Sequence, residues 1–402
     1  MQISKVAIIG AGTMGASISV AVASAGYEVY LRDVSPDALE QGLKKIDKMF
    51  QSLIRKGLAA EEAQSRKDRI HPVTQYQQLE NVDLVIEAVL EKIDIKQAVF
   101  RELERVCRAD TILATNTSSL SITEIAACTS RADKVIGLHF FNPAHLMKLV
   151  EVVPALQTSE KTCIQALEFA QSLDKLAVRV EECASFLVNR LLGRYMGEAL
   201  WCLQEGLATV SEIDKAVNDY VMPLGPLALR DMNGADIGLA VAKFNFQEYG
   251  ERFRPAPLLE RMVEKNWLGQ KTGKGFYLYD PETGKRTVAN SAVTELISSS
   301  EKSKAQFKVQ HLFLPMINEA FLALQEHVCA AEDLDPALMA GLGMRRGPLA
   351  LAEEMGLKTC LEETEKLFNT YGERFRPAPL LKRYVRAGKN SIKGADRELA
   401  TI

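Results

Sequence analysis

The residues with the clearest chemical potential in this sequence are a histidine and a glutamate, His139 and Glu151. The segment between them turns near Asn142 and Pro143 and returns through an apolar stretch, so we expect the two side chains to meet. A carboxylate on one imidazole nitrogen fixes the tautomer and stabilises the imidazolium, which leaves the other nitrogen free to take a proton. A histidine that follows a strand is more often structural when it stands alone. The acid partner favours a general base, a group worth about 10²–10⁴-fold in rate.

A second group of residues has the spacing of a phosphate-binding turn. Three glycines form the pattern Gly-x-Gly-x-x-Gly after an apolar run, Val6–Ile9, and before a stretch with helical spacing. The first allows a sharp exit from a strand, the second lets a pyrophosphate approach the backbone, and the third lets the helix pack closely. The predicted cofactor turn comprises Gly10, Gly12, Thr13, Met14 and Gly15. The alternative is a turn that is only structural.

Asp33 favours one cofactor over another. It ends the next apolar run, 18 residues after Gly15, where a carboxylate accepts hydrogen bonds from ribose hydroxyls and repels a 2'-phosphate. The sequence therefore predicts NAD rather than NADP, although Arg32 beside it is a residue that could contact a phosphate.

These groups need a sheet to position them. Short apolar runs alternate with helical stretches such as Ile95–Cys107, which predicts a doubly wound, mostly parallel sheet. The runs that read as strands are Val6–Ile9, Glu28–Leu31, Val82–Val89, Thr111–Leu120 and Lys134–Pro143. Ligands bind at the carboxyl ends of such strands. The polar residues expected there are Glu91 with Lys92, Ser118 with Ser119, and His139.

Composition excludes several classes of partner. A net charge of −3 over 402 residues provides no basic field for nucleic acid. The seven cysteines form no CxxC pair and have no histidine at zinc spacing, so we expect free thiols, a reducing compartment and no metal site. Since no apolar run reaches about 18 residues and no leader precedes the first strand, we expect a cytoplasmic protein without a membrane span.

Five stretches together resemble a known family. GAGTMG, NTSSLSI, GLHFFNP, MKLVEVV and FLVNR occur in this order, and the similarity extends from Val6 to about Tyr279. They resemble the short-chain L-3-hydroxyacyl-CoA dehydrogenase (3-hydroxybutyryl-CoA dehydrogenase) family, and the combination is far more specific than any one motif. The resemblance implies a Rossmann-like domain and a helical domain. It also implies reversible, NAD-dependent oxidation of (S)-3-hydroxyacyl-CoA to 3-oxoacyl-CoA, as in fatty-acid β-oxidation.

The resemblance also implies roles for individual residues. His139 matches the catalytic base, Glu151 its carboxylate partner, and Ser118 and Asn189 the residues that hold the substrate. Residues that match cofactor-lining positions are Glu91, Lys96, Asn142 and Lys271. Lys56 matches a basic residue that contacts coenzyme A.

Two departures from the family pattern stand out. The family usually has Pro-Gly where this chain has Ala184-Ser185, so we expect a differently shaped hinge between domains. After Pro143 the chain has Ala144-His145, where the family is more often apolar with a proline. His145 is either a surface residue or a residue at the mouth of the active site.

The back half contains a duplicated unit. YGERFRPAPLL fills Tyr249–Leu259 and returns unchanged at Tyr371–Leu381, and GPLAL occurs at Gly225–Leu229 and Gly347–Leu351. The offset is 122 residues here and 121 upstream, where MGEAL aligns with INEAF. A helical unit therefore occurs twice, from about Phe186 and from about Phe307.

The two copies differ chemically. Asn189 aligns with Gln310, Gly193 with Leu314, Gly197 with Asn318, and Lys271 with Asn390. Glycines inside a helix cost about 1 kcal/mol each relative to alanine, so close approach by a helix or by a ligand is expected at 193 and 197. We infer that the first copy works with the active site and that the second, degenerate copy is structural.

The expected organisation is an NAD-binding Rossmann domain at 1–185, a first helical domain at 186–290 and a second helical repeat at 305–402. The two repeats are expected to be all-α. Ser291–Lys304, rich in Ser and Lys, reads as a linker. The second copy makes either a monomer with an internal pseudo-dimer or a homodimer possible.

Two alternative functions remain open. One is a dehydrogenase of a small free hydroxy acid, such as a sugar acid or a carnitine-like compound, which needs no coenzyme A contact. The other is a non-catalytic NAD-binding structural protein, against which Ser118, His139, Glu151 and Asn189 together argue. A related class of 3-hydroxy acid dehydrogenases uses a lysine base, and FLVNRLLGRYM contains no lysine.

Overall fold

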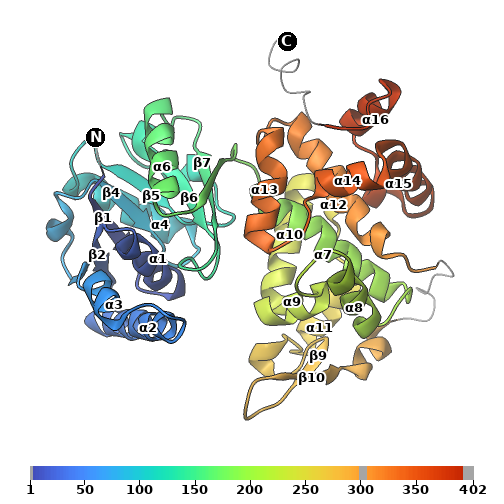
Figure 1. Cartoon of the computed structure of the whole chain (residues 1–402), viewed down its shortest axis with the longest axis horizontal. Helices are drawn as coiled ribbons and strands as arrows, with labels where there is room; N and C mark the ends of the chain where they lie inside the picture. The colour runs from blue at the N-terminus through green and yellow to red at the C-terminus, as the bar shows by residue number, and fades with distance from the viewer. Residues whose placement is uncertain (1–2, 298–305, 393–402) are drawn as a thin grey trace. The chain divides into compact units, whose positions relative to one another are not determined.

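The computed structural model describes residues 3–297 and 306–392. The chain divides into two compact units, Met1–Phe186 and Leu187–Ile402, and each is described by itself (Figure 1). No helix in the described ranges is long and apolar enough to cross a membrane.

An eight-stranded sheet organises the first unit, in the order β3-β2-β1-β4-β5-β6-β7-β8. The strands are β1 (Lys5–Ile9), β2 (Glu28–Arg32), β3 (Ile70–Val73), β4 (Leu84–Glu87), β5 (Ile112–Thr115), β6 (Val135–Phe140), β7 (Leu149–Pro154) and β8 (Leu176–Arg179). All neighbours are parallel except β6 and β7. The expected Rossmann-like, mostly parallel fold is therefore confirmed.

Six α-helices accompany this sheet in the described part of the first unit: α1 (Thr13–Ser24), α2 (Pro36–Arg55), α3 (Ala60–Lys67), α4 (Ile93–Val106), α5 (Ile122–Ala126) and α6 (Glu160–Ser172). The start of α2 shows how sequence fixes a boundary. Ser35 accepts a hydrogen bond from the Ala38 N–H at 3.1 Å, and Pro36 occupies the first helical position. Its apolar face then buries Leu39 and Phe50 in the core.

The second unit is helical and repeats the same order of elements (Figure 1). The first copy has α7 (Val188–Gln204), α8 (Val210–Tyr220), α9 (Pro226–Asn233), α10 (Ala235–Tyr249), the 3-10 turn η3 (Gly250–Phe253) and α11 (Pro257–Glu264). The second has α12 (Val309–Gln325), α13 (Ala331–Leu342), α14 (Pro348–Met355), α15 (Leu357–Tyr371), η7 (Gly372–Phe375) and α16 (Pro379–Arg386). The two long helices, α7 and α12, pack against each other.

Two expectations about this unit were wrong. The first repeat is not all-α, because β9 (Tyr277–Tyr279) and β10 (Arg286–Ala289) form an antiparallel hairpin after α11. The expected linker is structured at its start, where Ser291–Leu296 forms the 3-10 helix η5 and buries Val293. Its part at 298–304 lies outside the described residues.

Candidate active site

The glycine-rich turn joins β1 to α1. Gly10 has a φ of +103°, and a Cβ there would lie 2.6 Å from the Ala88 carbonyl oxygen. A Cβ on Gly15 would lie 1.7 Å from the Gly10 carbonyl oxygen, so the helix can start this close to the strand only with glycine. A Cβ on Gly12 would meet no atom within 4 Å. Thr13 and Met14 then open α1, and the turn fits a pyrophosphate at the helix N-terminus.

Asp33 lies just after β2 and braces this turn. One carboxylate oxygen accepts the Ala11 N–H at 2.6 Å, and the other accepts the Val34 N–H at 2.6 Å. The neighbouring Arg32 guanidinium lies over the Tyr76 ring, 3.7 Å from its centroid, and is therefore engaged within the protein. The residues at this strand end fit an NAD ribose better than a 2'-phosphate.

His139 and Glu151 face each other across β6 and β7. The antiparallel register pairs the two residues directly, and imidazole Nδ1 lies 2.6 Å from Glu151 Oε2. The glutamate is fully buried and the histidine is 6% exposed. The rings of Phe141 and Phe186 lie 4.5 and 5.6 Å from the imidazole, centroid to centroid. An ionised Glu151 keeps the proton on Nδ1, so Nε2 is the nitrogen available as a base.

Glu91 accepts hydrogen bonds from the polar residues that follow β5. Its Oε1 accepts the Thr117 hydroxyl at 2.6 Å and the Ser118 N–H at 2.9 Å. Burial raises the pKa of the Glu91 carboxyl, but the Lys96 ammonium and the Thr117 and Ser118 donors outweigh it, so the pKa is lowered. Glu91 is thus an anion that fixes the Ser118 loop, and the Ser118 side chain stays exposed.

Lys96 is held by a residue that sequence reasoning missed. The buried Lys96 ammonium lies 2.8 Å from Glu87 and 3.3 Å from Glu91. Glu87, at the end of β4, also accepts the Thr115 hydroxyl at 2.7 Å and the Val89 N–H at 2.7 Å. The signal was present in the sequence, since an acid inside the apolar run VDLVIEAV must have partners to be buried.

The other expected residues of this unit lie on loops and helix ends. Asn142 is exposed after β6, and Lys56 is exposed at the end of α2. His145 is partly buried rather than on the open surface, and its Nδ1 lies 2.8 Å from the Ser17 hydroxyl of α1. Burial lowers the pKa of His145, as do the charges of Lys175 and Lys56.

Asn189 and Lys271 belong to the second unit. Asn189 lies in the first turn of α7, and the Lys271 ammonium lies 2.6 Å from the Asp236 carboxylate. Their substrate and cofactor roles stay predictions. Ser185, one of the two hinge residues that depart from the family pattern, and Phe186 next to it have φ of +62° and +52°, a left-handed backbone that glycine adopts most readily.

The chain matches two family models over most of its length. Residues 5–183 match the model described as the NAD-binding domain of 3-hydroxyacyl-CoA dehydrogenase. Residues 186–279 and 307–398 each match the C-terminal domain of the same family. The duplication read from YGERFRPAPLL is therefore a duplication of that domain, and the expected NAD-binding domain is confirmed.

Individual relatives agree with the family models. A probable 3-hydroxybutyryl-CoA dehydrogenase of Bacillus subtilis is 42% identical over 286 residues, 70% of this chain and 100% of its own length. A fatty acid oxidation complex subunit alpha of Shewanella amazonensis is 34% identical over 396 residues, but the match spans 56% of that longer protein. The crystal structure of 3-hydroxybutyryl-CoA dehydrogenase from Escherichia coli K12 has a TM-score of 0.87 at 32% identity, covering 96% of this chain and 99% of that one. From its first strand to its second helical copy, this chain belongs to the 3-hydroxyacyl-CoA dehydrogenase family.

Proposed function

We propose that the chain catalyses the reversible oxidation of (S)-3-hydroxyacyl-CoA to 3-oxoacyl-CoA with NAD, the reaction of fatty-acid β-oxidation and related acyl-CoA degradation. The observation that carries the proposal is the buried hydrogen bond between His139 Nδ1 and Glu151 Oε2 at 2.6 Å. It leaves imidazole Nε2 free to take the proton of a substrate hydroxyl, and Glu151 stabilises the imidazolium that forms.

The remaining site residues position the reactants in this proposal. Gly10, Gly12 and Gly15 receive the dinucleotide, whose nicotinamide when bound accepts the hydride from the carbinol carbon. Glu91, Lys96, Asn142 and Lys271 line the cofactor. Ser118 and Asn189 hold the substrate hydroxyl and thioester, and Lys56 contacts coenzyme A.

One assay tests this function against its rivals. NADH oxidation is measured with acetoacetyl-CoA, a longer 3-oxoacyl-CoA and the free 3-oxo acid, for the wild type and for His139→Ala. We expect turnover of the CoA esters and a loss of about 10²–10⁴-fold in kcat for the variant. Turnover of the free acid alone would indicate the small hydroxy acid alternative. NADH binding without turnover of any substrate would indicate the structural alternative.

We propose further that the second helical copy serves the first as a partner subunit would. Reciprocal ion pairs support this: Arg252 of η3 lies 3.2 Å from Glu319 of α12, and Arg374 of η7 lies 3.2 Å from Glu198 of α7. The two arginines are equivalent in the repeat, and so are the two glutamates. This reciprocity is the signature of an isologous interface.

Light scattering tests the pseudo-dimer. A chain that ends at residue 297 loses the partner of α7, including Phe313, which stacks on Tyr195 at 5.0 Å. We expect the shortened chain to self-associate more strongly than the full chain at the same concentration. The same number of chains per assembly for the shortened and the full chain would count against the proposal.

The seven cysteines are all free thiols, which supports a reducing compartment such as the cytoplasm.

A further inference from the structure

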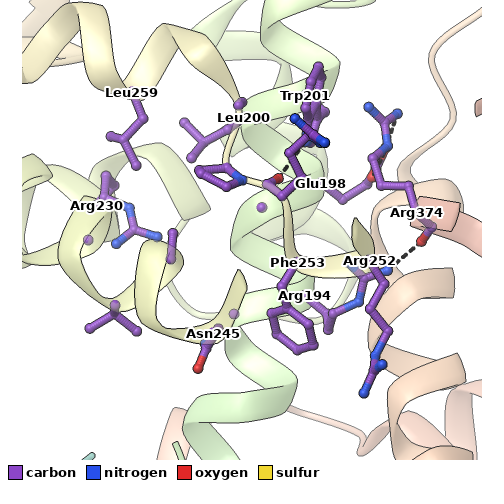
Figure 2. A pocket seen from close by; sticks show the side chains of 18 residues that line it. Arg194, Glu198, Leu200, Trp201, Arg230, Asn245, Arg252, Phe253, Leu259 and Arg374 are labelled. Atoms are coloured by element: carbon purple, nitrogen blue, oxygen red, sulfur yellow. Dashed lines mark hydrogen bonds and ion pairs between the residues drawn. The ribbon is translucent and has the colours of Figure 1, made fainter. Parts of the chain in front are cut away.

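A pocket lined by the first helical repeat and by Arg374 of the second contains none of the residues that the proposed reaction uses. It lies between α7, α9, α10 and the segment from η3 to α11, and Figure 2 shows the side chains around it. Its space open to the centre of a water molecule is about 40 Å³, enough for a small ligand rather than a single water. The walls are partly apolar, with Leu200, Val241 and Leu259 among them.

One arginine of this pocket has no carboxylate partner within the described part of the chain. Arg194, Arg252 and Arg374 have carboxylate partners, Glu319 for the first two and Glu198 and Glu205 for the third. Arg254 pairs with Glu251. The guanidinium of Arg230, at the left of the view in Figure 2, makes no hydrogen bond or ion pair with any described residue, and its Nε is buried.

The fold makes room for this arginine. A Cβ on Gly238 of α10 would lie 1.8 Å from Arg230 Nη1, so the guanidinium can pack against this part of α10 only because the residue is glycine. Burial lowers the pKa of Arg230 to about 10, which leaves the group charged at neutral pH. Arg230 is partly exposed with its Nε enclosed, and an anion in the pocket would supply the counter-charge that no described residue provides.

The second repeat provides an internal comparison at the same fold positions. There Arg230 is replaced by Ala352 and Gly238 by Cys360, both fully buried, so a thiol fills the place of the guanidinium. Gly193 becomes Leu314, and Gly197 becomes Asn318. The second copy therefore fills with side chains the space that the first copy keeps open.

Asn318 shows what the first copy lacks. Its side-chain oxygen accepts the Ala378 N–H at 2.7 Å. The equivalent N–H, on Ala256, borders the pocket and has no acceptor among the described residues. A Cβ on Gly197 would meet nothing within 4 Å, so the position of that missing oxygen is open. The pocket thus offers two donors, a guanidinium and a backbone N–H, for which residues 3–297 and 306–392 provide no acceptor.

From these features we propose that the pocket binds a small carboxylate. One carboxylate oxygen accepts the Ala256 N–H, as the side-chain oxygen of Asn318 accepts the Ala378 N–H in the second repeat. Arg230 supplies charge-assisted hydrogen bonds to the carboxylate. A short apolar tail packs against the apolar wall. The carboxylate comes either from a free short-chain acid or from the far end of an acyl chain. The acyl chain as a source rests on the proposed function, in which Asn189 contacts the substrate. Asn189 lies on the same face of α7 as Gly193 and Gly197, which line the pocket.

Calorimetric titration of the full chain with sodium butyrate, against sodium chloride at equal ionic strength, tests the site without any turnover. We expect saturable binding of butyrate and a Kd at least about tenfold higher in Arg230→Leu. Gly197→Asn, which copies the second repeat, should abolish binding. The double variant Arg230→Ala/Gly238→Cys reproduces the packing of the second repeat, so it should fold and should also fail to bind butyrate. Arg376→Leu removes an exposed, ion-paired arginine outside the pocket and should bind like the wild type.

A kinetic arm separates the two sources. kcat/KM is compared for acetoacetyl-CoA and for a 3-oxoacyl-CoA with a terminal carboxylate. If Arg230→Leu lowers kcat/KM about tenfold or more for the carboxylated substrate alone, the carboxylate belongs to the acyl chain. If the variant lowers kcat/KM for neither substrate while the wild type binds butyrate, the ligand is a free acid. The proposal fails if chloride binds as tightly as butyrate, or if Arg230→Leu changes neither binding nor kinetics. A protein that turns over no acyl-CoA refutes the proposed function but leaves the titration readable.

Discussion

At the scale of single residues, the catalytic proposal depends on a carboxylate that is hard to bury. Glu151 is fully enclosed, and its contact with His139 Nδ1 is one of the interactions that make this burial tolerable. A neutral amide at the same place would keep the shape and lose the negative charge. The charge is needed most when the imidazole has taken a proton.

Glu151→Gln should therefore lower kcat by about 10–100-fold, less than loss of the imidazole, because the base remains but its protonated form is less stabilised. NADH affinity should not change, since the glycine turn and Asp33 belong to other elements. Steady-state kinetics and NADH fluorescence titration measure the two quantities. A variant with unchanged kcat, or one that loses NADH binding instead, would contradict the assigned role.

A second glutamate is expected to make stability depend on pH. Burial raises the pKa of Glu198 to about 7, outweighing Arg374 and Arg194, and the Glu205 charge acts in the same direction as burial. The ordinary value is 4.5, so the folded state holds this proton more tightly than the unfolded state. Its stabilising contribution is complete below about pH 4.5 and is lost as the pH rises through 7.

We expect Glu198→Gln to remove about 1–3 kcal/mol of the decrease in unfolding free energy between pH 5 and pH 8. Urea unfolding of both proteins at several pH values measures it. Glu326→Gln, at a partly exposed position, is the matched control and should keep the wild-type pH dependence. A parallel pH dependence of Glu198→Gln and wild type would show that Glu198 does not titrate in this range.

At the scale of elements, each helical repeat caps one helix with an acid from another. Asp214 of α8 accepts the Leu227 and Ala228 N–H groups of α9, both at 2.9 Å. Asp335 of α13 accepts the Leu349 N–H of α14 in the same way, also at 2.9 Å. A Cβ on Gly225 or Gly347 would lie about 2.2 Å from the capping carboxyl carbon. The repeated word GPLAL therefore preserves this cap.

Asp335→Ala should destabilise the chain by about 1–2 kcal/mol through the lost cap and leave kcat unchanged, because the second copy carries no catalytic residue in the proposal. Asp214→Ala should cost more, since Asp214 also accepts the Tyr277 hydroxyl at 2.8 Å. Denaturant unfolding and the acetoacetyl-CoA assay check both statements. A large fall in kcat for Asp335→Ala would assign the second copy a direct role in the reaction.

Elements with a strong local pattern were predictable from the sequence. The β1-turn-α1 unit follows from glycine spacing, and the long helix from Val188 follows from its apolar stripe. The strands β3 and β8 and the hairpin β9–β10 were not identified. They are short, β8 is only partly buried and β10 is largely exposed, so their sequences lack the long buried apolar run that revealed the central strands.

The candidate site was predictable in its residue types but not in its supporting contacts. The hairpin-like return correctly brought Glu151 to His139. The Glu87–Lys96 pair and the Ser17–His145 contact join residues from different elements, and no local pattern records such contacts. The pocket at Arg230 likewise depends on Gly238 and Ala256, which approach it only in the folded repeat.

At the scale of the whole molecule, two copies of one helical domain share buried charges. Glu319 of the second copy is fully enclosed and meets three arginines of the first: Arg190 at 2.8 Å, Arg252 at 3.2 Å and Arg194 at 3.6 Å. Glu198 returns the arrangement with Arg374. The retention of GERF in both copies is explained by these pairs, because each arginine serves the other copy's glutamate.

Glu319→Ala leaves three guanidinium groups with less compensation in the interior. We expect a loss of about 3–5 kcal/mol in unfolding free energy, the cost of breaking a buried ion pair from one side. Glu326 also contacts Arg190, at 2.7 Å, but its side chain is 42% exposed, so Glu326→Ala should cost less than about 1 kcal/mol. Denaturant unfolding of the two variants measures the contrast. Equally small losses of unfolding free energy in both variants would mean that the copies are joined mainly by apolar packing of α7 on α12. The ion pairs between the copies would then select the pairing without stabilising it.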